Sequence, residues 1–419
     1  MFRSAIWSLL HTETKEKGDF NEYIKNSKER RKKLRKIQKY DFKIDNYILF
    51  TSNTKLVVKS NKKFLHRIFS PILENLNFKF RVVLFGEEEF KNKFNSKWSF
   101  ISKKLNIDRF KKDRYDYKCN QLTEDIFKIM EGLPSYINKA NMCWNAELIA
   151  WTEKLWHELL NGKLPKVICL SSYLCPFNLG LIRIAKNYNV KVIELAHGKQ
   201  GLFNPVYSHW GKNASENYNL VPDIFVTWRK DSQKIFEEKL GKKSIYSCNP
   251  LLMKYTRRKY QKKYISIFLQ GPSNNVKIPL HVKDLITKNK DFAFAIKPHP
   301  GEEKPQYVND LLKGNNVFLL NPNEDSYQLL HESFCALTSY SSIIQDCVDL
   351  NINCGVYGKQ GLDVYKEEIK NDLVFDFTES ISLKEVIEGN PSLVTQSAEG
   401  SIEKRFKRTI SLITQLATT

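Results

Sequence analysis

Short, nearly continuous apolar runs recur along the chain and alternate with longer segments whose apolar residues follow helical spacing. Many of the short runs lack strict polar alternation, which is typical of parallel strands covered on both faces. The predicted strands are residues 46–52, 80–86, 166–172, 190–196, 223–228, 264–270, 292–298, 316–320, 335–339 and 354–358. This alternation predicts a doubly wound α/β protein.

The clearest unit is KVICLSSYLCPFNLGLIRIAKNYNVKVIELAHG, in which two apolar strands flank a helix predicted from Phe177 to Tyr188. That order is a βαβ crossover, which places its two strands parallel in one sheet.

The length of 419 residues favours two domains over one. A strand-like segment at 244–250 is followed by a basic connector before the strand pattern restarts at 264. We therefore predict an N-terminal Rossmann-like domain (1–255, with a basic N-terminal region), a C-terminal one (262–400), and a helix within 401–419 that packs back on the first. Two such domains place their strand ends around a shared cleft, where ligands bind.

The formal net charge of +21 predicts an anionic partner. The basic residues concentrate at 25–43 and 254–264, which form either a solvated face or a surface attracted to anionic lipid. Each basic residue near such a lipid surface adds about 1 kcal/mol. Nucleic acid is disfavoured, since the chain has no zinc-finger spacing, RRM signature or recognition-helix pattern.

The eight cysteines never form C-x-x-C and lie in apolar segments, so they predict buried thiols in a reducing compartment and no metal site. The apolar patch at the N-terminus is too interrupted for a signal peptide, and no run approaches the ~18 apolar residues of a membrane span. We expect a cytoplasmic protein, peripheral at the inner face of the cell membrane.

Two stretches after second-domain strands carry candidate phosphate ligands. In IKPHPGE, prolines on either side of His299 fix the loop that also holds Lys297, which indicates either a phosphate site or a surface turn. In LTSYSS, four hydroxyl side chains precede a helix that begins at Ile343: Thr338, Ser339, Ser341 and Ser342. One hydroxyl suffices for an N-cap, and the others favour an anion site at the helix start.

Two weaker candidates also follow strands. Gln270 and Gly271 end the first strand of the second domain, where a glycine lets a ligand approach the backbone. Glu87 and Glu89 follow the strand at 80–86 and are either functional or merely solvated. The chain has neither a G-x-G-x-x-G fingerprint nor a P-loop, so an ordinary NAD enzyme or NTPase is disfavoured.

In the first domain, Glu194 and His197 lie at the end of the βαβ unit, three positions apart. Either is a candidate general base, and the alternative is a core-edge histidine with a capping partner. His197 is slightly favoured because it lies beyond the strand, beside Gly198, where a substrate can reach it.

Several stretches, taken in order, resemble a GT-B glycosyltransferase of bacterial surface polysaccharide synthesis (capsule, lipopolysaccharide or teichoic type). They are ELAHGKQG, VPDIFVTWRKDSQKIFEE, CNP, IKPHPGE and LLHESFCALTSYSSIIQDCVDLNINCGVYG, within 165–360. The last two are similar to the HP and Ser/Thr motifs of sialyl- and Kdo-type transferases that use CMP-activated sugars. They also resemble CDP-glycerol glycerophosphotransferases, which carry Asp where this chain has Ser339.

The resemblance implies two Rossmann-like domains facing a central cleft, an acceptor side at His197 and Glu194, and a nucleotide-donor side in the second domain. The donor-binding residues it implies are Lys297, His299, Pro300, Thr338, Ser339, Ser341, Ser342, Gln270 and Gly271. It further implies inverting, metal-independent transfer of a sugar, expected to be a CMP-linked ulosonic acid, to a surface-polysaccharide or lipid-linked acceptor. No cofactor beyond this nucleotide-sugar co-substrate is expected.

Three alternatives remain open. One is a CDP-glycerol- or CDP-ribitol-type transferase of a polyol phosphate. Another is an enzyme like UDP-GlcNAc 2-epimerase, which shares the two-domain architecture. The last is a non-catalytic basic protein that binds membrane or polysaccharide.

Overall fold

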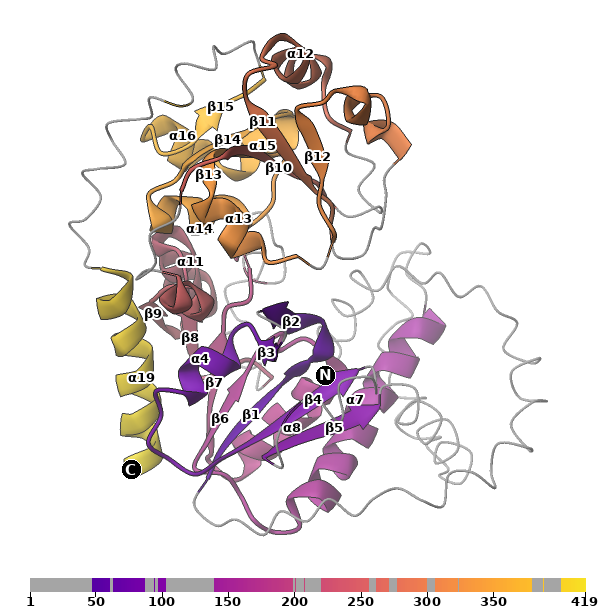
Figure 1. Cartoon of the computed structure of the whole chain (residues 1–419). Coiled ribbons are helices and arrows are strands. Elements are labelled where there is room, and N and C mark those ends of the chain that lie inside the picture. The colour runs from indigo at the N-terminus through magenta and orange to yellow at the C-terminus, as the bar shows by residue number, and fades with distance from the viewer. Residues whose placement is uncertain are drawn as a thin grey trace.

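The chain folds into two parallel sheets, one in each of two domains, together with a small antiparallel hairpin (Figure 1). This computed structural model describes residues 47–60, 63–86, 94, 97–102, 139–198, 200, 207, 220–255, 261–270, 277–299, 306–322, 324–378, 387 and 401–419. No helix in these ranges is long and apolar enough to cross a membrane.

The first domain contains a seven-stranded sheet in the order β5-β4-β1-β6-β7-β8-β9, and every neighbouring pair is parallel. Its strands are β1 (Ile48–Asn53), β4 (Phe80–Gly86), β5 (Trp98–Ser102), β6 (Val167–Leu170), β7 (Lys191–Leu195), β8 (Ile224–Thr227) and β9 (Lys243–Tyr246). The chain runs outward from β1 to β5 and then returns to place β6 on the other side of β1. The carboxyl ends of β1 and β6 therefore form the topological switch point, where open α/β sheets bind ligands.

Alternate residues of each central strand enter two different cores, one on each face of the sheet. Ile168 and Leu170 of β6 belong to the core that includes α7 (Lys139–Leu160) and α8 (Pro176–Asn187). The intervening Cys169 belongs to the opposite core. That core is covered by α4 (Phe69–Leu73) and by α19 (Ile402–Thr418), which Figure 1 shows alongside the first domain. Burial on both faces explains why these strands read as continuous apolar runs.

Gly180 of α8 lets this helix approach α7 closely. A Cβ added to Gly180 would lie 2.4 Å from Thr152 Oγ1 and 2.5 Å from the backbone nitrogen of Glu153. The contact is reinforced by Trp156, whose ring N–H donates to the Phe177 carbonyl at 2.8 Å. The close packing holds the start of α8, and with it the loop that leaves β6.

The second domain repeats the design with six parallel strands in the order β12-β11-β10-β13-β14-β15. They are β10 (Tyr264–Phe268), β11 (Ala293–Lys297), β12 (Val317–Leu319), β13 (Ser333–Thr338), β14 (Asn353–Val356) and β15 (Phe375–Asp376). One core contains α12 (Leu280–Lys288). The other contains residues of α13 (Ser326–His331), α14 (Ile343–Leu350), α15 (Lys359–Val364) and α16 (Lys366–Lys370). The switch point lies between β10 and β13.

Every strand predicted from the apolar runs is present, with ends shifted by a few residues, and the predicted helices at 177–188 and from Ile343 are α8 and α14. The prediction missed the antiparallel hairpin of β2 (Val57–Ser60) and β3 (Lys63–His66). Lysines in both strands break up the apolar pattern there. The short strands β5 and β15 were also not predicted.

The chain passes from the first domain to the second after β9, through the short 3-10 helix η3 (Pro250–Lys254). Asn249, which is fully buried, precedes η3 and donates to Tyr327 Oη at 2.7 Å and to Asp346 Oδ1 at 3.0 Å. From α19, Arg405 forms an ion pair with Asp349 of α14 at 2.9 Å. The helix α14 is therefore held on the side of the first domain by two buried polar contacts.

Candidate functional site

The carboxyl ends of the second-domain strands form one row, in which Phe268 is in register with both Lys297 and Thr338. The Thr338 hydroxyl is fully buried, donates to the Phe268 carbonyl at 2.7 Å and accepts from Gln270 Nε2 at 3.1 Å. Thr338 and Gln270 thus brace β13 against β10 at the switch point. Gly271 lies outside the described residues.

Lys297 ends β11 and His299 follows two residues later, and the environments of the two side chains differ. The Lys297 side chain is buried, and its ammonium donates to the Pro322 carbonyl. Burial lowers the pKa of Lys297 to about 8, against the opposing effect of Glu324 and Asp325. His299 is exposed, and its pKa is lowered by partial desolvation and then by the charge of Lys297. Pro300 lies outside the described residues.

The hydroxyl-rich segment leads from β13 directly into α14. Ser339 is buried, and Gly361 packs so closely against it that an added Cβ would lie 2.0 Å from the Ser339 carbonyl oxygen. Ser341 Oγ accepts from the backbone N–H of Ile343 at 3.4 Å. Ser342 occupies the N-cap position but makes no side-chain capping hydrogen bond. A partly exposed hydroxyl therefore stands at the positive end of α14, a position suited to an anion.

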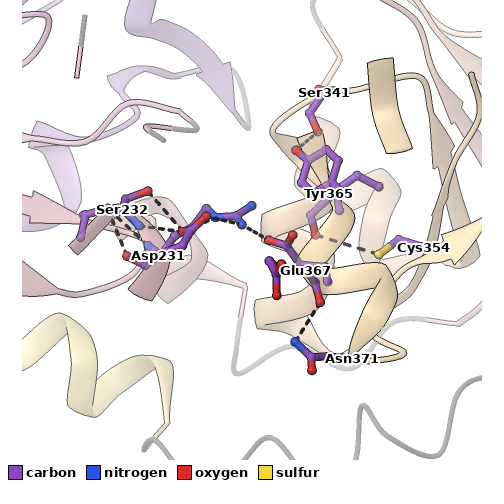
Figure 2. Close-up of polar contacts among 11 residues, drawn as sticks. Asp231, Ser232, Ser341, Cys354, Tyr365, Glu367 and Asn371 are labelled. Carbon is purple, nitrogen blue, oxygen red and sulfur yellow. Dashed lines mark hydrogen bonds and ion pairs between the residues drawn. The ribbon is translucent and has the colours of Figure 1, made fainter. Parts of the chain in front are cut away.

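A hydrogen bond from Tyr365 also holds this hydroxyl-rich segment in place. The Tyr365 hydroxyl donates to the Ser341 carbonyl at 2.7 Å, and Figure 2 shows the ring directed at Ser341. The guanidinium of Arg229, from the first domain, lies 5.8 Å from the same ring. Arg229 is paired with Asp231 at 2.7 Å and forms a second ion pair with Glu368 of α16. The start of α14 is thus tied through Tyr365 to the domain boundary.

Glu194 lies at the end of β7 and is fully buried. Its Oε1 accepts from the Ser172 backbone N–H at 3.1 Å, and the Tyr173 N–H and Tyr207 hydroxyl also favour its charged form. Burial outweighs these contacts and raises the pKa of Glu194 well above its usual range. Ser172 itself adopts φ 65°, in the left-handed region that non-glycine residues rarely occupy. Glu194 therefore braces the strained loop after β6.

His197 lies just beyond β7 and is half-buried. Its Nε2 is 3.5 Å from Ser172 Oγ, while its Nδ1 is buried without a hydrogen-bond partner. Burial and, second, the positive charge of Arg67 lower the pKa of His197 to about 4. The imidazole is therefore neutral at pH 7, and burial and Arg67 make it a weaker base than an exposed histidine.

The two halves of the candidate site meet at Gly198 and Ser342. A Cβ added to Gly198 would lie 4.0 Å from Ser342 Oγ, which is ordinary van der Waals contact across the domain boundary. The structure thus brings His197 and Gly198 together with Ser342 at the start of α14. Glu87 and Glu89 lie outside the described residues, as do residues 25–43 and 256–260 of the basic clusters.

Two residues of this region were not predicted from the sequence, His66 and Arg67, which end the β2–β3 hairpin. His66 Nδ1 accepts from the backbone N–H of Phe69 at 3.1 Å, so its proton lies on Nε2, which is buried without a partner. Burial, followed by the charges of Arg67 and His197, lowers the pKa of His66 well below its usual range. The signal available in the sequence was a His-Arg pair just ahead of a helix that begins at Phe69. Among the described residues, no group of three His, Cys, Asp or Glu side chains is placed to hold a metal ion.

The fold is similar to those of a solved glycosyltransferase and a solved epimerase of a sugar nucleotide. The glycotransferase of kitacinnamycin matches with a TM-score of 0.53 and 10% identity, over 89% of this chain and 100% of that chain. UDP-GlcNAc 2-epimerase from Neisseria meningitidis matches with a TM-score of 0.50 and 15% identity, over 88% of this chain and 100% of that chain. The wall teichoic acid polymerase TagF matches with a TM-score of 0.47 and 12% identity, over 100% of this chain and 98% of that chain. A TM-score this low supports no structural argument. No protein-family model and no curated protein matches the sequence. The predicted GT-B fold is confirmed.

Proposed function

We propose that the protein is a GT-B glycosyltransferase that transfers a sugar from a nucleotide-activated donor to a glycan or lipid-linked acceptor. The observation that carries this proposal is the position of His197 and Gly198 beside Ser342. It brings the residue after the neutral His197 imidazole, beyond the end of β7, into contact with the helix start at the switch point of the second domain. The shared fold is consistent with this activity.

In this proposal the donor phosphate lies at Ser341, Ser342 and the start of α14, and His299 also binds the donor. The acceptor hydroxyl gives its proton to His197 while its oxygen bonds to the anomeric carbon. The bond from that carbon to the donor phosphate breaks, and its electron pair leaves with the phosphate. Donors fixed around the leaving group stabilise the charge that develops there. Because Glu194 is fully buried behind Ser172, His197 is the better candidate for the base.

For the donor, we propose a CMP-linked ulosonic acid, on the basis of the HP and Ser/Thr resemblance. For the acceptor, we propose a surface polysaccharide or lipid-linked glycan, which the charge of +21 would bring together with the enzyme at an anionic membrane. For Lys297, Thr338 and Gln270, predicted to bind the donor, we propose that they support the loops of the donor site, since each is hydrogen-bonded to a neighbouring protein group. We propose the same for Ser339, which is buried against Gly361.

Calorimetric titration with CMP, CDP, UDP and GDP tests this function. Binding of CMP in preference to the others is expected, and failure of all four to bind would exclude a nucleotide-dependent transferase. His299→Ala should abolish binding. Liposome binding without any nucleotide affinity would instead identify a non-catalytic membrane protein.

Product analysis separates the remaining enzymes. A phosphodiester product, which contains phosphorus, would show a CDP-polyol transferase. Conversion of UDP-GlcNAc without an acceptor would show a 2-epimerase, whose fold this chain shares. A glycoside product is the outcome that we expect.

A further inference from the structure

Arg67 lies where the two domains meet, immediately after β3. Its Nη2 is 3.4 Å from Tyr327 Oη on α13, and its Cζ is 5.9 Å from the Trp228 ring of the first domain. It is also close enough to His197 and to Asp346 of α14 for its charge to act on both. Arg67 thus lies near both the proposed base and the helix that begins after Ser342.

Arg67 has no anionic partner in the described part of the chain, which sets it apart from the two other boundary arginines. Arg229 is paired with Asp231 and Glu368, and Arg405 is paired with Asp349. Arg67, by contrast, makes one long hydrogen bond to a neutral hydroxyl. Its Nε is buried without a partner, as are Arg229 Nη1 and Arg405 Nε, so the difference lies in the missing carboxylate. Desolvated charges in proteins are normally paired, because an uncompensated one is costly.

The position of Arg67 indicates which kind of anion would pair with its guanidinium. An arginine presents a planar fork of N–H donors that matches the oxygens of a phosphate. The Ser342 hydroxyl and the start of α14, the helix that carries Asp346, supply donors suited to the same group. Asp346 is not the anionic partner of Arg67, because its Oδ1 accepts from Asn249 and it forms no ion pair with Arg67.

We propose that Arg67 binds the donor phosphate from the first-domain side, facing the start of α14. This inference rests on the proposed function, because it assumes a nucleotide-activated donor. It adds a phosphate ligand that neither the sequence nor the fold comparison assigns.

Phosphate binding at Arg67 would also strengthen His197 as a base. The groups around His197 are His66 and Arg67 from the hairpin and Ser172 from the loop after β6, with Glu194 at the end of its own strand. In the free protein the charge of Arg67 disfavours a second positive charge on the imidazole. Once a phosphate pairs with Arg67, that repulsion is offset and the proton affinity of His197 rises. The base would then reach full strength only with the donor in place.

The test compares Arg67→Gln with Arg408→Gln, which removes the same charge from an exposed position on α19. CMP and UDP are titrated by calorimetry into the full-length protein. The loss of a charge-assisted hydrogen bond predicts about 10- to 100-fold weaker binding for Arg67→Gln. Arg408→Gln should bind as the wild type does. If the wild type binds neither nucleotide, the proposed function fails; if Arg67→Gln binds with unchanged affinity, only this inference fails.

An NMR titration of the His197 ring supplies a second readout that does not depend on turnover. In the wild type the pKa of His197 should rise when CMP binds, whereas in Arg67→Gln it should already be higher and should change little. If Arg67→Gln is not folded, Arg67→Lys replaces it, because it keeps the charge but loses the fork. Arg67→Lys should bind CMP more weakly than the wild type, and equal affinity would overturn the inference.

Discussion

The Tyr365 hydroxyl donates to the main-chain carbonyl of Ser341 at 2.7 Å, and this bond fixes the hydroxyl-rich segment from behind. Tyr365 is fully buried and lies beside Arg229, which is paired with carboxylates of both domains. The geometry at Ser341 and Ser342 is therefore supported by a contact that reaches the domain boundary, although Tyr365 itself need not touch a ligand.

Tyr365→Phe removes this bond without changing the packing of the ring. We expect a loss of about 1 kcal/mol in the free energy of unfolding, as for a typical buried hydrogen bond. CMP affinity should fall several-fold, since the donor segment is less well ordered. Urea denaturation and calorimetry measure the two effects. Tyr188→Phe, at an exposed position, is the matched control, and equal CMP affinity in both variants would show that Tyr365 serves stability alone.

His197→Ala should lower kcat by about 10²- to 10⁴-fold, the usual contribution of a general base. Its CMP affinity should stay close to that of the wild type, because the phosphate ligands lie elsewhere. Steady-state kinetics and calorimetry check the two parts. His157→Ala, in an exposed position near the end of α7, should behave like the wild type. If turnover survives in His197→Ala, another group takes the proton.

Gly198 offers a steric test of the proposed site. A methyl group there would make ordinary contact with Ser342 Oγ, so Gly198→Ala should fold and retain activity. Gly198→Val adds bulk between the two halves of the site and should lower kcat/KM strongly while leaving the melting temperature nearly unchanged. Wild-type kinetics in Gly198→Val would place the reaction away from this junction.

Asp346 should make the stability depend on pH. Burial raises its pKa to about 7, with Arg67, Asn249, Asp349 and Tyr327 as its polar neighbours. An unfolded aspartate loses its proton near pH 4. Between these values the folded state holds the extra proton, so the contribution of Asp346 to stability falls as the pH rises from about 4 to 7 and then levels off.

Asp346→Asn removes that titration. The unfolding free energy of the wild type minus that of Asp346→Asn should fall with pH by at most about 1.4 kcal/mol per unit. Urea denaturation at pH 5 and pH 7.5 measures the difference, with the exposed Asp363→Asn as the control. A difference that rises with pH would mean that Asp346 is charged in the folded state at low pH.

The sequence pattern was sufficient for the sheets because a strand buried on both faces must be apolar at almost every position. It also located His197 and the Ser339–Ser342 segment, because in parallel sheets the residues after strands gather at one edge. These inferences need only the order of elements along the chain.

The hydrogen-bond and ion-pair partners of individual side chains could not be predicted from the sequence. Lys297 was predicted to bind the donor phosphate, and only the structure shows that its ammonium donates to the Pro322 carbonyl, 25 residues away. Arg67 reaches Tyr327, 260 residues away, only because the hairpin folds back and the domains meet. Contacts of this kind depend on the relative placement of two sheets. The local spacing of apolar residues along the chain does not determine that placement.

The return of α19 to the first domain joins the two domains a second time, through side chains. Residues of α19 belong to a core of the first domain, and its Arg405 is paired with Asp349 of α14 at 2.9 Å. Any opening of the junction between Gly198 and Ser342 that moves α14 away from α19 would therefore have to break this buried ion pair.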